Sequence, residues 1–266
     1  MTGPALASVA SDSKYLGCHL PEDELACLAE QFEWGAPEVK AVADTFSYLA
    51  ARKREKTAAM ALNMSRIPQK SPKTFEGFDF SRLQGKGGEA LALLPRLTNL
   101  YARKNLAFIG PEGVGKTHLA QAYGREVCMQ GMRSYYIKAS ELRDKLDKAV
   151  KAGTGSSVVN LLVNPHCLII DEVGRCTFDK ACTDLFFHIV DRRCDKECPN
   201  LTILTSNYGP DSWGEYFTGD STLLCTLDRL FDNASVFMMK GQSFRGSGLE
   251  TFAVEAVPSV MKVPAR

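Results

Sequence analysis

Residues 110–117 read Gly-Pro-Glu-Gly-Val-Gly-Lys-Thr, which is the G-x-x-x-x-G-K-[ST] pattern of a phosphate-binding loop. An apolar run precedes this segment at residues 106–109, and a helix-like stretch follows it at residues 118–123. A strand, a glycine-rich turn and a helix in this order let backbone N–H groups and a helix N-terminus face one anion. Because the four fixed positions match by accident in only ~1% of chains of this length, the motif predicts nucleotide binding.

The side chains of this loop indicate how a nucleotide would be held. Lys116 can reach the β- and γ-phosphates, and the Thr117 hydroxyl can ligate Mg²⁺. The glycines let the backbone curl around the phosphates. We expect ATP to be bound by the whole segment, which consists of Gly110, Pro111, Glu112, Gly113, Val114, Gly115, Lys116 and Thr117.

Two adjacent carboxylates, Asp171 and Glu172, follow an apolar run at residues 167–170. In phosphate-loop enzymes the first acid of such a pair lies beside the loop and holds Mg²⁺, usually through water. The second acid can polarise a water for in-line attack on the γ-phosphate. A strand that ends in solvated acids is the ordinary alternative, but a position about 50 residues after a phosphate loop favours the functional interpretation. We therefore expect Thr117 and Asp171 to hold Mg²⁺ and Glu172 to be catalytic.

Asn207 follows a second apolar run at residues 201–206. In a parallel sheet the carboxyl ends of the strands meet at one edge, where ligands bind. Asn207 is therefore a candidate for orienting the attacking water, although an Asn at a strand end is often only a turn residue.

The rest of the second part of the chain alternates short apolar runs with helical patterns. This alternation predicts an α/β fold in which a parallel sheet is covered by helices on both faces. We expect strands at residues 105–109, 134–138, 167–171, 201–206 and 235–239, and helices at 88–103, 116–130, 140–150 and 178–195.

The sequence also predicts how the chain is divided. Residues 1–16 are small and polar and are expected to be disordered, and residues 17–67 have the pattern of a small helical domain. A linker with two prolines is expected at residues 68–80, the nucleotide-binding domain at 81–246 and a flexible tail at 247–266.

Charge is distributed unevenly near the N-terminus. Residues 1–50 carry a net charge of −6, whereas residues 51–73 carry +6. A basic run within the second segment is a candidate for contacts with nucleic-acid phosphates, although charged helices are usually only solvated. The run lacks interleaved aromatic residues, so base stacking is not indicated. Its members are Arg52, Lys53, Arg54 and Lys56.

Cysteine usage and hydropathy bear on the cellular setting. Nine cysteines, an odd number, are scattered through the chain, and this favours a reducing, cytoplasmic location. No run approaches 18 apolar residues, so no membrane span is expected. Cys194 and Cys198 invite a zinc interpretation, but their spacing lacks a paired C-x-x-C and favours ordinary thiols. His118 is expected to pack rather than to catalyse.

Taken together, the phosphate loop, the Asp-Glu strand end and the Thr-Ser-Asn strand end resemble an AAA+ ATPase. Further segments at residues 206–208, 213–215, 227–230 and 241–245 make the chain similar to the IstB-type helper ATPases of insertion sequences, which are relatives of the DnaC-type helicase loaders. The resemblance covers roughly residues 74–246. It departs at residues 173–177, where relatives carry a Leu-Gly-Tyr-Leu-Pro-like segment, and a full helical lid domain is not expected.

The resemblance implies two further site residues and a set of partners. Arg229 corresponds to an arginine finger that acts in trans on ATP at a subunit junction, and Arg245 corresponds to a second sensor that reaches the γ-phosphate of its own subunit. The implied protein is a homo-oligomer with ATP at its subunit junctions that binds double-stranded DNA and a cognate transposase. A helicase loader is the alternative, and a small-molecule kinase is disfavoured because these residues suit hydrolysis coupled to assembly.

Overall fold

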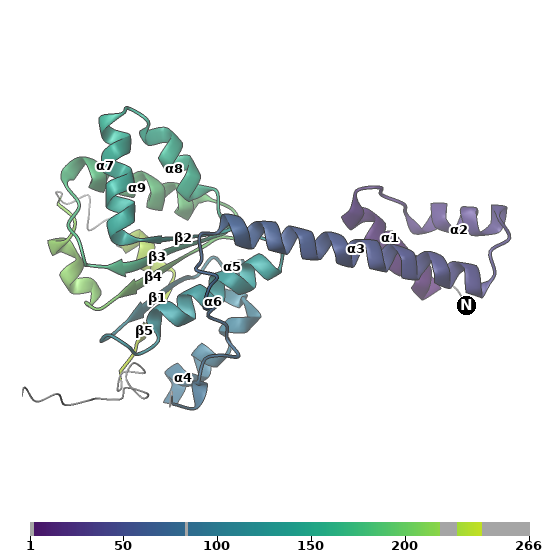
Figure 1. Ribbon diagram of the computed structural model, residues 1–266, viewed down its shortest axis with the longest axis horizontal. Coiled ribbons are helices and arrows are strands. Elements are labelled where there is room, and N and C mark those ends of the chain that lie inside the picture. Colours follow the sequence, from purple (N-terminus) through teal and green to yellow (C-terminus); the bar gives the residue numbers. More distant parts are fainter. Residues whose placement is uncertain (1–2, 83–84, 219–227, 241–266) are drawn as a thin grey trace, which may run out of the picture.

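The computed structural model describes residues 3–82, 85–218 and 228–240. An α/β body holds the phosphate loop, and a long helix, α3 (Ala36–Met64), projects from this body and carries two shorter helices at its far end (Figure 1). None of the helices within these described ranges is long and apolar enough to cross a membrane.

Five strands form the sheet of the body, in the order β2-β3-β4-β1-β5, and every neighbouring pair is parallel. The predicted parallel sheet is therefore confirmed. β3 runs two residues further than expected and β5 is shifted by one. The strands are β1 (Asn105–Ile109), β2 (Ser134–Lys138), β3 (Cys167–Val173), β4 (Leu201–Ser206) and β5 (Ala234–Met238).

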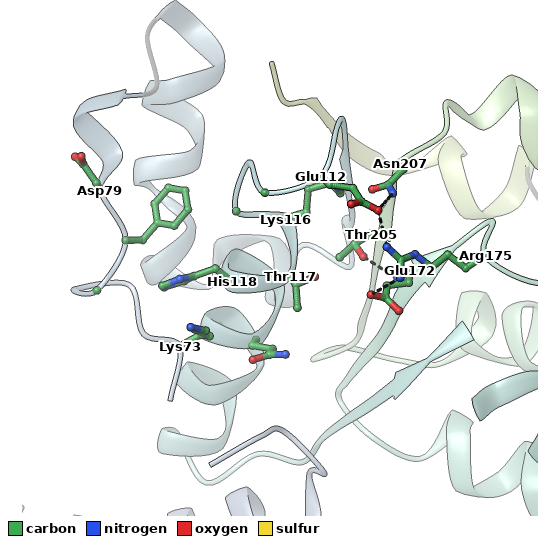
Figure 2. A pocket seen from close by; sticks show the side chains of 15 residues that line it. Lys73, Asp79, Glu112, Lys116, Thr117, His118, Glu172, Arg175, Thr205 and Asn207 are labelled. Carbon is green, nitrogen blue, oxygen red and sulfur yellow. Dashed lines mark hydrogen bonds and ion pairs between the residues drawn. The ribbon is translucent and has the colours of Figure 1, made fainter. Parts of the chain in front are cut away.

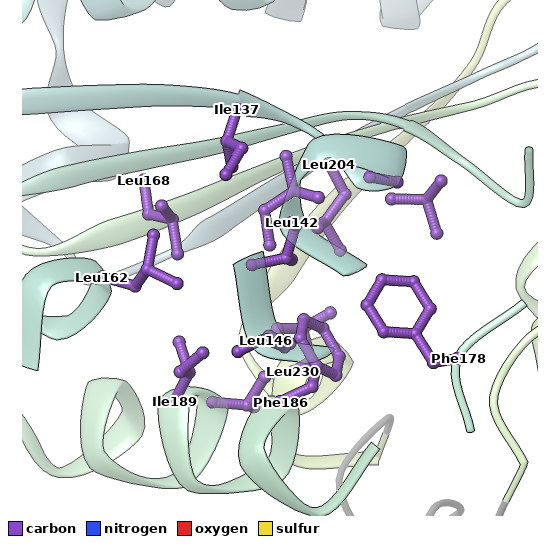
Figure 3. Close-up of a cluster of buried hydrophobic side chains, with 14 of the residues drawn as sticks. Ile137, Leu142, Leu146, Leu162, Leu168, Phe178, Phe186, Ile189, Leu204 and Leu230 are labelled. Atoms are coloured by element: carbon purple, nitrogen blue, oxygen red, sulfur yellow. The ribbon is translucent and has the colours of Figure 1, made fainter. Parts of the chain in front are cut away.

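Helices cover both faces of the sheet, because β1, β2, β3 and β4 each contribute buried apolar side chains to both sides. One face packs against α7 (Ala139–Lys151), α8 (Gly155–Val163) and α9 (Lys180–Asp195). Figure 3 shows Leu142 and Leu146 of α7 and Ile189 of α9 in this cluster, together with strand residues. The other face packs against α6 (Lys116–Met129) and the segment that precedes β1.

The helices of the body differ from the prediction in two places. α8 was not predicted, although it contributes Val159, Leu162 and Val163 to the core. The single helix expected at residues 88–103 is instead three short elements. Leu97 adopts the left-handed conformation with φ 54° and separates the second element from the third. These elements are α4 (Gly85–Ala92), η2 (Leu94–Arg96) and α5 (Thr98–Tyr101), preceded by η1 (Phe80–Arg82).

The prediction that residues 1–16 are disordered is wrong for the described residues, which form α1 (Gly3–Leu16). Leu6 and Val9 of α1 are buried against Leu25 of α2 (Glu22–Gln31) and Val39 of α3. This small apolar cluster lies at the far end of α3 from the body (Figure 1). We call α1, α2 and the part of α3 that they contact the N-terminal unit.

The other end of α3 is attached to the body. Ala61 and Leu62 of α3 pack against Cys128 of α6. Directly after α3, the Ser65 carbonyl accepts a hydrogen bond of 2.7 Å from the backbone N–H of Tyr136 in β2. In the predicted linker, Phe75 and Phe78 are buried in the core of the body. The predicted tail at residues 247–266 lies outside the described residues.

Candidate functional site

The phosphate loop connects β1 to α6 at the carboxyl edge of the sheet. Gly113 and Gly115 have φ values of 80° and 95°, in the left-handed region that favours glycine. A Cβ atom on Gly115 would lie 2.6 Å from the Phe78 ring, so the loop packs too closely there for any side chain. The loop lines a cavity of about 510 Å³, large enough for a nucleotide-sized ligand.

Lys116 is held by the loop itself. Its side chain is buried, and its ammonium donates hydrogen bonds to the carbonyl oxygens of Gly110 at 2.7 Å and Pro111 at 2.6 Å. These contacts keep one positive charge directly at the loop, where an incoming phosphate group would meet it.

Asp171 is buried at the end of β3, and hydroxyl groups satisfy both of its carboxylate oxygens. Thr117 and Thr205 donate to its Oδ1 at 2.9 and 2.5 Å, and Tyr136 donates to its Oδ2 at 2.6 Å. Burial, together with the nearby Asp171 carboxylate, raises the pKa of Tyr136. The phenol therefore stays protonated and keeps donating to Asp171.

Glu172 lies within a β-bulge, since the pairing of β3 with β4 shifts register between Ile170 and Val173. Its φ of 62° lies in the left-handed region, which costs a non-glycine residue of order 1–3 kcal/mol. The Glu172 backbone N–H donates to the Thr205 hydroxyl at 2.9 Å. A bulge redirects side chains, and here it includes both Asp171 and Glu172, which lie at the carboxyl end of β3.

Two cations flank the Glu172 carboxylate. The Lys138 ammonium, at the end of β2, lies 3.3 Å from one oxygen, and the Arg175 guanidinium lies 3.4 Å from the other. Sequence reasoning missed both cations. Lys138 could have been found because it ends a predicted strand of the same sheet, whereas nothing in the sequence pattern marks Arg175.

Asn207 lies at the end of β4, as its predicted role requires. Its amide donates to a Glu112 carboxylate oxygen at 3.3 Å, and the Arg175 guanidinium donates to the same oxygen at 2.6 Å. Figure 2 shows Glu112, Arg175, Glu172 and Asn207 together on one side of the loop. The structure thus brings the predicted loop, Glu172 and Asn207 to one cavity. Asp171 is buried and reaches the cavity lining through its hydrogen bond with Thr117.

The opposite side of the cavity is lined by His118 and by residues from the segment that was predicted as a linker. His118 accepts or donates a 2.7 Å hydrogen bond with the Thr74 carbonyl and contacts the Phe78 ring edge to face, with ring centroids 5.3 Å apart. These contacts fit the packing role expected for His118. Lys73 lies near it (Figure 2). His118 and Lys73 both line the cavity, and Lys73 belongs to the segment predicted as a linker. This segment therefore forms one wall of the cavity.

The oxygen atoms at Asp171 fit a magnesium ion. The buried Asp171 carboxylate and the Thr117 hydroxyl are hard oxygen donors, the ligand type that Mg²⁺ prefers. Within the described residues no cluster of three or more His, Cys, Asp or Glu side chains forms a separate metal site. A magnesium ion held by Thr117 and Asp171 would therefore be completed by water and nucleotide oxygens.

Of the two arginines implied by the resemblance, one can be located. Arg229 lies in a helical segment before β5 and forms an ion pair with Asp191 of α9. It lines a different cavity, of about 380 Å³, and not the one at the phosphate loop. Arg245 lies outside the described residues.

Two side chains of the basic run on α3 form contacts with α1. The Lys53 ammonium donates to the carbonyl oxygens of Tyr15 at 2.8 Å and Leu16 at 2.9 Å, at the end of α1. Arg54 forms an ion pair of 2.8 Å with Asp12 and lies over the Tyr15 ring. These two side chains therefore hold α1 on α3.

The remaining members of the run, Arg52 and Lys56, are exposed on α3. Arg52 donates to the Tyr48 hydroxyl at 3.1 Å and lies over its ring. The folded chain thus brings Tyr48 and Tyr15 beside a run that has no aromatic residue within it.

Comparisons with known proteins agree with this architecture. Residues 28–248 match the family model described as IstB-like ATP binding protein. The ATP-binding protein of insertion sequence IS5376 from Geobacillus stearothermophilus is 34% identical over 194 residues, which are 73% of this chain and 75% of the relative. That of insertion sequence IS21 from Pseudomonas aeruginosa is 30% identical over 222 residues, 84% of this chain and 76% of the relative.

Solved structures share the fold. The DnaC helicase loader matches with a TM-score of 0.51 and 19% identity, over 63% of this chain and 97% of that chain. AMPPCP-bound DnaA from Aquifex aeolicus matches with a TM-score of 0.53 and 23% identity, over 65% of this chain and 51% of that chain. The expected fold of the core is therefore confirmed, and the chain belongs to the family of IstB-like ATP-binding proteins of insertion sequences.

Proposed function

We propose that this protein hydrolyses ATP with Mg²⁺ and that it uses this activity to assist a transposase on double-stranded DNA. One observation carries the catalytic part: Lys116, Thr117, Asp171, Glu172 and Asn207 come from three separate segments and meet at one edge of the sheet. Their side chains supply a cation for phosphates, oxygens for a metal ion, a base and an amide donor.

Each residue has a distinct role in this proposal. Lys116 and the loop backbone bind the β- and γ-phosphates, while Thr117 and Asp171 hold Mg²⁺, which neutralises charge on the phosphate oxygens. Glu172 accepts a proton from the attacking water, and Asn207 orients that water. The bulge and the two flanking cations fix where the Glu172 carboxylate lies.

Hydrolysis is proposed to depend on assembly of several subunits. Arg229 is exposed and lies away from the nucleotide cavity of its own chain, so a neighbouring subunit would have to supply this residue. In other NTPases an arginine finger contributes 10³–10⁵ in rate. The Arg229–Asp191 ion pair would then open when two subunits meet.

DNA and the transposase are proposed as partners because the relatives belong to insertion sequences. Arg52, Lys53, Arg54 and Lys56 on α3 are the proposed contacts to DNA phosphates. Lys53 and Arg54 already contact α1, so Arg52 and Lys56 are the members of the run from which we expect the larger contribution. Phosphate contacts make DNA affinity fall as salt concentration rises.

The catalytic part is tested by comparing Lys116→Ala and Glu172→Gln with the wild type. Lys116→Ala should lose nucleotide binding. Glu172→Gln should bind ATP, but its turnover should fall by at least about 100-fold, because general-base catalysis contributes 10²–10⁴ in rate. The exposed Lys40→Ala on α3 serves as the matched control and should behave as the wild type. Equal turnover of Glu172→Gln and the wild type would contradict the assignment.

The partner part is tested by sedimentation of the wild type and Glu172→Gln with duplex or single-stranded DNA, with and without ATP and Mg²⁺. ATP-dependent assemblies on duplex DNA support the proposal. Binding to single strands alone would contradict it and would favour a helicase loader. The Arg52→Gln/Lys56→Gln double variant should weaken duplex binding and reduce its dependence on salt.

A further inference from the structure

In the cavity, the Glu112 carboxylate accepts hydrogen bonds from two side chains that are able to bind an anion. One oxygen of Glu112, in the phosphate loop, accepts hydrogen bonds from Arg175 at 2.6 Å and from Asn207 at 3.3 Å (Figure 2). The three residues come from the phosphate loop, the turn after β3 and the end of β4, and all three line the same cavity. Their convergence on one oxygen therefore depends on the fold and not on proximity in the sequence.

A carboxylate and a phosphate group present the same kind of partner to these donors. A guanidinium binds the oxygens of either anion through parallel N–H groups, and an amide N–H can donate to either. Glu112 therefore takes the place that a phosphate oxygen would take between Arg175 and Asn207. The stand-in is held weakly, because the Glu112 and Arg175 side chains are 62% and 47% exposed and exposed ion pairs contribute about 0–1 kcal/mol.

We propose that Arg175 binds the terminal phosphate of ATP and that Glu112 is an internal substitute for this phosphate when ATP is absent. This inference rests on the proposed function and adds to it a residue that recognises the terminal phosphate. The terminal phosphate of ATP displaces the Glu112 carboxylate from Arg175 and Asn207. ADP lacks that phosphate, so Glu112 keeps its hydrogen bonds from Arg175 and Asn207 when ADP is bound.

The exchange also changes the surroundings of the proposed base. Besides its contact with Glu112, the Arg175 guanidinium lies 3.4 Å from a carboxylate oxygen of Glu172. When Arg175 turns toward the phosphate, Glu172 loses this cation and retains Lys138. The terminal phosphate thereby alters the electrostatic environment of the carboxylate that is proposed to activate water for attack on it.

The two partners of this ion pair should have opposite effects on ATP binding, and this sets the test. Affinities for AMPPCP and ADP, each with Mg²⁺, are measured by calorimetry for the wild type, Arg175→Ala, Glu112→Gln and the double variant. Arg175→Ala should weaken AMPPCP binding about 10-fold, the scale of one hydrogen bond to a charged group, and ADP binding by less than about 2-fold. Glu112→Gln should strengthen AMPPCP binding about 3-fold, since an exposed ion pair no longer competes.

The double variant separates the exchange from simple charge repulsion. If Glu112 acts by occupying Arg175, then Glu112→Gln should have little effect on AMPPCP binding once Arg175 is Ala. Arg175→Lys keeps the charge but loses the forked geometry and should give an intermediate affinity. Thermal unfolding of each variant without nucleotide should match the wild type, because both side chains are largely exposed.

Three results would overturn the inference: equal loss of AMPPCP and ADP affinity in Arg175→Ala, weaker AMPPCP binding in Glu112→Gln, or fully additive effects in the double variant. The proposed function fails in a different way. A wild type that binds neither nucleotide contradicts the nucleotide site itself. A wild type that binds and hydrolyses ATP, with variants that leave the AMPPCP-to-ADP affinity ratio unchanged, contradicts only the exchange at Arg175.

Discussion

The α/β body and the N-terminal unit are stabilised in different ways. The body buries two large apolar clusters on the two faces of a five-stranded sheet. The N-terminal unit has one cluster of four buried apolar side chains and adds contacts between α1 and the basic run of α3. In the body, each buried side chain belongs to a large cluster of packed residues. The N-terminal unit depends on a few contacts, and single substitutions can remove them one at a time.

The largest effect is expected from Arg193 in the body. This side chain of α9 is buried and donates hydrogen bonds to the Thr202 hydroxyl and to several carbonyl oxygens, including those of Pro165 and Leu201. Burial lowers the pKa of Arg193 to about 10, so the guanidinium stays charged at neutral pH. Arg193→Met removes all of these hydrogen bonds, although Lys196 still donates to the Pro165 carbonyl oxygen at 2.9 Å. It should lower the free energy of unfolding by about 3–5 kcal/mol, because each buried acceptor left without a donor costs about 1–3 kcal/mol.

Urea unfolding of Arg193→Met measures this loss, and the exposed neighbour Arg192 provides the control. Arg192 donates to the Asn160 side chain at 2.7 Å, and Arg192→Met should change stability by no more than about 0.5 kcal/mol. Similar losses in the two variants would mean that the buried hydrogen bonds around Arg193 do not stabilise the body.

A smaller and local effect is expected from Leu25 of α2, which is buried in the N-terminal unit. Leu25→Ala should destabilise this unit by about 2–4 kcal/mol, because it leaves a cavity among few neighbours. Hydrogen exchange should accelerate in α1 and α2 and stay unchanged in β1, β3 and β4. Leu49→Ala, at an exposed position of α3, is the control. Faster exchange in the strands would show that the unit and the body unfold together.

The smallest effect is expected from the Arg54–Asp12 ion pair between α3 and α1. The Arg54 side chain is 50% exposed and that of Asp12 10% exposed, so solvent screens part of the attraction. A double-mutant cycle with Arg54→Gln and Asp12→Asn should give a coupling of about 0.5–1 kcal/mol that falls at high salt. A coupling independent of salt would contradict an electrostatic origin.

The same contrast explains what could be predicted from the sequence. The strands of the body are short apolar runs, and the phosphate loop has a spacing set by its chemistry, so both were located from local pattern. Asp171 and Asn207 followed because parallel strands end at one edge. α1 was missed because its apolar residues find their partner, Val39, only after the chain turns back.

The missed site residues have a related cause. The hydroxyl of Tyr136 reaches Asp171 from 35 residues away, and Arg175 reaches Glu112 across 63 residues. Neither residue belongs to a recurrent spacing, so only the folded chain reveals these contacts. The β-bulge at Glu172 likewise depends on pairing with β4, which the sequence of β3 alone does not specify.

The continuous length of α3 has a mechanical consequence. At about 1.5 Å per residue, its 29 residues span about 43 Å. Its base rests on α6, which begins at the phosphate loop, and next to β2, which carries Tyr136 and Lys138. A tilt of about 5° at that base displaces the far end by about 4 Å for a helix of this length. A small rearrangement around the loop that tilted α3 would therefore move the N-terminal unit by about the width of a side chain.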